Sequence, residues 1–79
     1  MNAIPVESST LETIAYDNTR ELLQLEFNSH TFYLYFGVPA TVHEGLMYAP
    51  SKGGYFNRNI RGKFPYRRIS EAAMSAGRR

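Results

Sequence analysis

The side chains of this chain that could do binding chemistry are concentrated in residues 51–68. This segment holds six cations and no acid, and tyrosine, phenylalanine and glycine are interleaved with the cations. Guanidinium and ammonium groups bind phosphates, and tyrosine rings stack on nucleobases. The pattern therefore predicts a surface for a polyanion. The candidate contact residues are Lys52, Tyr55, Arg58, Arg61, Lys63, Tyr66, Arg67 and Arg68.

The modest net charge of +2 conceals a strong asymmetry along the chain. Residues 1–50 carry one cation against six acids, a net charge of −5, whereas residues 51–79 carry eight cations against one acid, a net charge of +7. Such a division allows the acidic part to dock on the basic part and neutralise some of it. It also allows head-to-tail self-association, or a basic surface that stays available to a partner.

A helix is expected to position most of the candidate residues. Ser51 is a good N-cap, the helix should run to about Arg61, and Gly62 is a good stop. At 100° per residue, Phe56 and Ile60 form an inward stripe. The outer strip then consists of Tyr55, Arg58 and Arg61. The alternative is an ordinary solvated helix face with a half-buried tyrosine.

The sequence predicts no catalytic residue, no metal site and no cofactor. Residues 51–54 could attract an anion at a helix N-terminus, but they lack the GxxxxGK[ST] pattern of a phosphate loop, so a cap and turn is favoured. His30 and His43 are the only histidines, and the chain has no cysteine. Neither histidine has metal ligands at a suitable spacing. We therefore expect a protein that is not an enzyme.

The rest of the chain predicts an α+β fold. Residues 11–16, 21–27 and 31–36 read as strands, and turn residues such as Asp17 and Asn18 separate them. Residues 39–48 read as a helix that Gly45 either weakens or brings close to the sheet. Residues 64–69 should be extended. The expected architecture is a three-stranded antiparallel meander with two short helices packed on it.

The domain organisation is expected to be simple. Residues 1–9 should form a flexible lead-in, residues 10–69 a single domain, and residues 70–79 a disordered tail. Within the third strand, Tyr33 and Tyr35 share one face, and Phe32, Leu34 and Phe36 share the other. Aromatic residues on a sheet can stack on bases, but in a chain this short we expect them to be core.

Two motifs resemble a known family. The segments Tyr33–Pro39 (YLYFGVP) and Ala49–Gly62 (APSKGGYFNRNIRG) are similar to the KTSC domain, and the resemblance covers about residues 6–69. That family is named after a C-terminal appendage of some lysyl-tRNA synthetases, and it also occurs as small free-standing bacterial and phage proteins. The family has no settled activity. The resemblance implies RNA binding by association only, and it implies no aminoacylation.

The function that we expect is a non-catalytic nucleic-acid-binding module, with RNA as the partner. The alternative is a protein-interaction module that docks its basic face on an acidic protein partner. Residues 1–10 have no secretory signal, and no apolar run approaches the length of about 20 residues that spans a bilayer. A cytoplasmic protein without a membrane partner is therefore expected. The sequence leaves the oligomeric state open.

Overall fold

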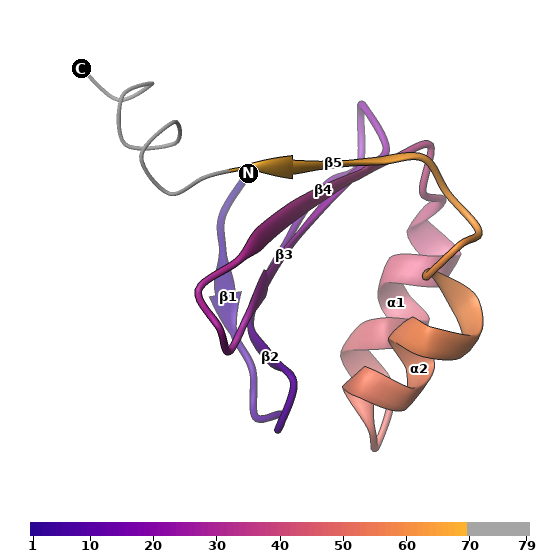
Figure 1. The fold of residues 1–79 in the computed structure, drawn as a ribbon. Coiled ribbons are helices and arrows are strands. Elements are labelled where there is room, and N and C mark those ends of the chain that lie inside the picture. Colours follow the sequence, from indigo (N-terminus) through magenta and orange to yellow (C-terminus); the bar gives the residue numbers. More distant parts are fainter. Residues whose placement is uncertain (70–79) are drawn as a thin grey trace.

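The computed structural model describes residues 1–69, in which a five-stranded antiparallel sheet carries two helices. The strands lie side by side in chain order, and the last one returns after both helices to pair with its predecessor (Figure 1). The elements are β1 (Ile4–Pro5), β2 (Leu11–Asp17), β3 (Leu22–Phe27), β4 (Phe32–Phe36), α1 (Ala40–Tyr48), α2 (Lys52–Asn59) and β5 (Tyr66–Ile69).

The α+β class, the three central strands and the two helices were predicted correctly, but the three-stranded sheet was wrong. Strand β1 comes from the expected lead-in and pairs with β2, and β5 comes from the expected extended segment and pairs with β4. Strand β1 pairs with the strand that follows it, whereas β5 pairs with a strand far earlier in the chain, and in each case the partner satisfies backbone groups of the added strand. Local sequence pattern does not reveal such pairing. The predicted tail at residues 70–79 lies outside the described part of the chain.

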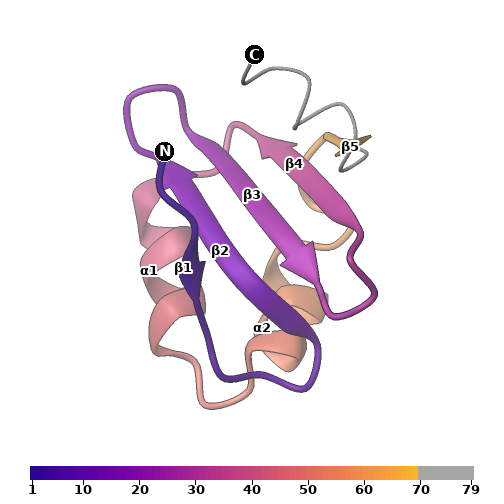
Figure 2. The ribbon, with the colours of Figure 1, turned by 90° about the vertical axis from the view of Figure 1, so that its left-hand side faces the viewer.

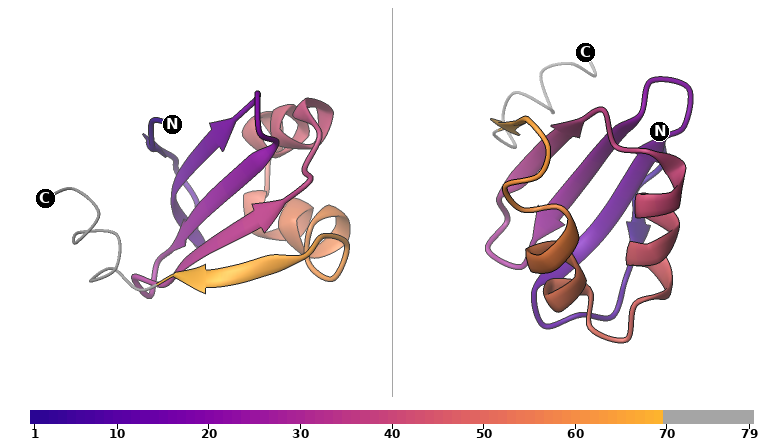
Figure 3. Two further views of the ribbon diagram at one scale, coloured as in Figure 1. Left: turned by 90° about the horizontal axis from the view of Figure 1, so that it is seen from above. Right: turned by 90° about the vertical axis from the view of Figure 1, so that its right-hand side faces the viewer.

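Both helices cover the same face of the sheet (Figure 3). The strand register places Leu23 opposite Tyr35 and Leu25 opposite Tyr33, so these side chains share the face that the helices cover. The predicted inward stripe of α2 is confirmed, because its residues belong to the same buried cluster. That cluster consists of Leu11, Ile14, Leu23, Leu25, Tyr35, Val38, Leu46, Phe56 and Ile60.

The opposite face of the sheet is open to view in Figure 2, where no described element lies over β3 and β4. Phe32, Leu34 and Phe36 face this side, as their alternation with the two tyrosines predicted. Their side chains are only partly buried. The expectation that the aromatic residues of this strand belong to the core therefore holds for the helix side alone.

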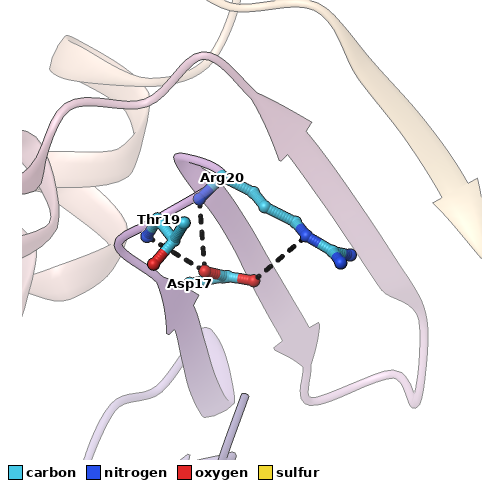
Figure 4. A network of polar contacts seen from close by, with 3 residues as sticks. All are labelled: Asp17, Thr19 and Arg20. Carbon is cyan, nitrogen blue, oxygen red and sulfur yellow. Dashed lines mark hydrogen bonds and ion pairs between the residues drawn. The ribbon is translucent and has the colours of Figure 1, made fainter.

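Asp17 closes the turn between β2 and β3 (Figure 4). One oxygen of its carboxylate accepts hydrogen bonds from the backbone N–H groups of Thr19 and Arg20, at 3.0 and 3.2 Å. The other oxygen lies 4.0 Å from Nε of Arg20. Asp17 was predicted as a turn residue, and these hydrogen bonds are how it stabilises the turn. A left-handed backbone conformation in this turn falls on Glu21, with φ 55°.

The two helices pack together where α1 has no side chain. A Cβ atom added to Gly45 would overlap the ring of Tyr55, so the glycine allows α2 to approach closely. The sequence suggested that Gly45 allows an approach to the sheet, and the structure shows that its partner is the second helix.

A stacked pair holds α1 on the sheet. The rings of Tyr16 and His43 lie 4.4 Å apart at an interplanar angle of 10°, and the Tyr16 hydroxyl donates a hydrogen bond to the carbonyl of Val38. Burial lowers the pKa of His43, and the nearby Glu44 opposes this shift. The folded state therefore favours the neutral imidazole.

Gly45→Ala should destabilise the fold by about 1 kcal/mol, because overpacking against Tyr55 outweighs the gain in helix propensity. In a Tyr55→Ala background the same substitution should instead stabilise by up to about 1 kcal/mol. Urea unfolding of the four proteins of this double-mutant cycle measures the difference. Equal effects of Gly45→Ala in both backgrounds would contradict the packing assigned to Tyr55.

Stability should fall as the pH drops below the ordinary histidine pKa of 6.5, since the pKa of His43 is lowered in the folded state. The neutral imidazole of His43 contributes to the free energy of unfolding above this pH, and this contribution is lost as the pH falls below it. Urea unfolding at about pH 8 and about pH 5 should show that His43→Phe loses less stability in acid than the wild type, because the variant keeps a ring but cannot titrate. His30→Asn is the control that removes the other histidine and keeps His43, so its loss of stability in acid should exceed that of His43→Phe. Equal acid losses in wild type and His43→Phe would refute the prediction.

Candidate functional site

A groove of about 490 Å³ lies on the helix-covered side, between the β4–β5 edge of the sheet and α2. Aromatic side chains and polar side chains both line it. The aromatic ones come from three strands and one helix, and they are Phe27, Tyr33, Tyr35, Phe56 and Tyr66. The polar ones come from α2, its C-terminal turn and two loops, and they include Thr10, Ser29, Thr31, Asn57 and Arg61.

Strand pairing assembles the aromatic part of the groove. Tyr35 and Tyr66 are directly opposed between β4 and β5, and Tyr33 follows two residues away on the same face. The rings of Tyr33 and Tyr66 stack with centroids 5.4 Å apart at 15°. Phe56 meets Tyr35 edge to face at 5.8 Å. The cluster runs from the core to the surface, because Tyr35 is 2% exposed and Tyr66 is 58% exposed.

Two neighbouring phenols and one guanidinium lie close enough to affect the pKa of Tyr35. Burial raises the pKa of Tyr35 to about 12; the phenols of Tyr33 and Tyr66 add to the rise, and Arg61 opposes it. Tyr35 therefore keeps its proton at neutral pH and can still donate a hydrogen bond. Within residues 1–69, no carboxylate is among the side chains that line the groove.

The structure divides the predicted contact residues between several surfaces. Arg61 and Tyr66 line the groove, whereas Arg58 and Lys63 are exposed outside its lining. The pairing of Tyr35 with Tyr66 places Arg68 on the helix side of β5 and Arg67 on the other side. The cations therefore lie on α2, in the loop that follows it, and on both faces of β5, the last strand of the sheet.

Lys52 and Tyr55, two of the predicted contact residues, have packing roles in the structure. The ammonium group of Lys52 donates hydrogen bonds to the carbonyls of Met47 and Ala49, both at 3.1 Å, where α1 ends. A cation there complements the helix dipole. Tyr55 is partly buried against α1, so it interrupts the outer strip that was expected with Arg58 and Arg61.

The start of α2 is a capped helix end. The predicted N-cap is confirmed, because the hydroxyl of Ser51 accepts a hydrogen bond from the N–H of Gly54 at 3.2 Å. With this amide satisfied and Lys52 turned to α1, the arrangement matches the cap and turn that the sequence favoured over a phosphate cradle.

The acidic part of the chain does not pair with the basic segment within residues 1–69. The two ion pairs found there join Arg20 to Asp17 at 4.0 Å and His30 to Glu26 at 3.9 Å. Both lie in the acidic part. In the described part of the chain, the expected neutralisation by ion pairing is therefore not observed.

Sequence reasoning missed the groove itself. It placed Tyr33 and Tyr35 in the core, which is right for Tyr35, while Tyr33 is partly buried. The spacing of the two tyrosines was a usable signal, but Tyr66 joins them only through the pairing of β5. Asn57 gave no signal, because an exposed asparagine on a helix is unremarkable in sequence.

Across residues 1–69, no three histidine, cysteine, aspartate or glutamate side chains come together as metal ligands. None of the helices there is long and apolar enough to cross a membrane.

Comparisons with known proteins agree with the two sequence motifs. Residues 7–64 match the model of the KTSC domain. A lysine–tRNA ligase of Trichormus variabilis is 47% identical over 64 residues, which cover 81% of this chain but only 11% of the ligase. A protein of Tsukamurella paurometabola is 38% identical over 60 residues, which cover 76% of this chain and 90% of that protein.

A solved structure shares the fold. The crystal structure of a KTSC domain protein from Yersinia pestis superposes with a TM-score of 0.85 at 39% sequence identity, and the match covers 87% of this chain and 97% of that one. The family model, the sequence relatives and the fold all agree. The chain therefore belongs to the KTSC domain family.

Proposed function

We propose that this chain is a non-catalytic RNA-binding module. The observation that carries the proposal is a set of exposed cations at the end of α2, in the following loop and on β5, none of which pairs with a carboxylate within residues 1–69. We call this set the basic surface, and it consists of Arg58, Arg61, Lys63, Arg67 and Arg68.

The relatives favour RNA among the possible polyanions. A segment of lysine–tRNA ligases is similar to 81% of this chain, and those enzymes by name act on a tRNA. Because the match spans 11% of the ligase, it carries no ligase activity to this chain. The match supports RNA binding only by association, because the similar segment is part of an enzyme that acts on RNA.

The layout of the cations favours a flexible strand over a rigid duplex. Arg67 and Arg68 point to opposite faces of β5, so one flat surface cannot contact both. A single strand or a loop can curve around this edge and place phosphates on each side. Binding would release counterions from the phosphates, and Tyr66 would stack on a base with little readout of sequence.

Binding of single-stranded RNA should weaken steeply with salt. Three to five phosphate contacts predict that the affinity falls about 20- to 100-fold between about 50 and about 200 mM salt. Fluorescence anisotropy of end-labelled RNA measures this, with a structured RNA titrated in parallel. Absence of salt-dependent binding at tens of micromolar protein would overturn the proposal. A pull-down that retains an acidic protein after nuclease treatment would support a protein-interaction module instead.

Arg67→Gln should weaken RNA binding several-fold. It should also reduce the slope of log affinity against log salt concentration by about the amount that one phosphate contact contributes. The matched control is Arg20→Gln, which removes the same charge from the turn between β2 and β3, where that arginine is paired with Asp17. The control should leave both affinity and slope close to wild type. If the two variants lose affinity equally, net charge rather than the basic surface determines binding.

A further inference from the structure

The groove beside the basic surface is built differently from a simple phosphate site. We propose that it holds one unstacked nucleobase of the bound RNA, while Arg61 contacts the adjacent phosphate. This inference rests on the proposed function, because the basic surface must bring the strand to the groove.

The aromatic lining suits the faces of a base. Five aromatic side chains line a groove of about 490 Å³, a volume within the range of about 300 to 1,000 Å³ that is typical of small-molecule pockets. Tyr66 is the most exposed of them, and Tyr33 supports its ring from one side at 5.4 Å. An exposed ring held by a second ring is a preorganised stacking surface, and stacking accepts any base.

The polar lining suits the edges of a base. Bases carry both donors and acceptors, and the amide of Asn57 can act as either. The hydroxyls of Ser29 and Thr31, which lie 3.0 Å apart, offer the same versatility on another side of the groove. The phenol of Tyr35 stays protonated at neutral pH and adds a donor near the floor.

The charge of the groove argues against other ligands. Aromatic cages also bind quaternary ammonium groups, but such a cation would meet the positive charge of Arg61, and the part of the lining that the structure describes offers no compensating carboxylate. An isolated phosphate would use Arg61 but not the aromatic floor. A nucleotide uses both, because it joins a flat ring with polar edges to an anion.

The groove and the basic surface are continuous. Arg61 belongs to both of them, and Tyr66 is followed directly by Arg67 and Arg68 on β5. Arg61 lines the groove and Arg68 lies on the same side of the sheet, so a strand held by these two arginines passes the open side of the groove. One of its bases can turn in and stack without the strand leaving the phosphate contacts.

The test compares two labelled single strands of about ten nucleotides, one with bases and one abasic, which share the same sugar–phosphate chain. The full-length wild type should bind the strand with bases at least about 10-fold more tightly than the abasic strand. Tyr66→Ser should lose most of this difference and leave the abasic affinity unchanged, whereas Tyr66→Phe, which keeps the ring, should retain it. Tyr48→Ser is the matched control, since Tyr48 is 86% exposed on α1 outside the groove.

A second measurement locates the base. In ¹⁵N–¹H spectra of the wild type, nucleoside 5′-monophosphates should shift the amide signals of Asn57, Gly62 and Tyr66 more than ribose 5-phosphate does. Equal binding of both strands, with no effect of Tyr66→Ser, would overturn the base site while the basic surface stands. Failure to bind either strand would overturn the proposed function and this inference with it. Saturable shifts of the same signals on addition of choline would indicate that the groove binds a quaternary ammonium cation and not a nucleobase.

Discussion

The candidate site depends on the pairing of β5 with β4. After β4 the chain turns away at Gly37, forms both helices, and returns so that the N–H of Phe36 donates to the carbonyl of Pro65 at 3.0 Å. From there the two strands run antiparallel and place Tyr66 opposite Tyr35. The pairing of β5 with β4 completes one wall of the groove, and it places Arg67 and Arg68 at the edge of the sheet. Without it, the tyrosines of β4 would be an ordinary sheet surface.

One face of helix α2 packs in the core, and another face lines the groove. Phe56 and Ile60 are buried, and Tyr55 fills the space that Gly45 leaves on α1. Asn57 on α2 and Arg61 just beyond it line the groove. Gly62, with φ 74°, then reverses the chain in a conformation that other residues adopt with strain. Much of the distinctive composition of residues 51–62 therefore stabilises the fold, and a smaller part faces a ligand.

The cations of β5 also protect an exposed edge. An edge strand presents unpaired backbone groups to other chains, and charged side chains oppose such pairing. Arg67 and Arg68 occupy this edge, next to the partly buried Phe32, Leu34 and Phe36 on the open face of the sheet. The same positive charge that would attract a phosphate chain thus opposes the addition of a further strand. A structural role and a binding role for these arginines are compatible.

The sequence by itself determined the local elements and the family. The alternation of Leu23 and Leu25, the cap at Ser51 and the turn at Asp17 were all predictable, because each depends on residues within a few positions of one another. Two motifs were enough to identify the KTSC domain. Only the tertiary structure decided that β1 and β5 join the sheet, that Lys52 binds the end of α1, and that Tyr66 completes a groove. Lys52 and β1 meet partners nearer in the chain, but these contacts too depend on how the helices and strands are placed in the fold. The groove depends on a contact between segments far apart in the chain, Tyr35 with Tyr66, and a local pattern of hydrophobicity and charge does not specify which distant partner a segment meets.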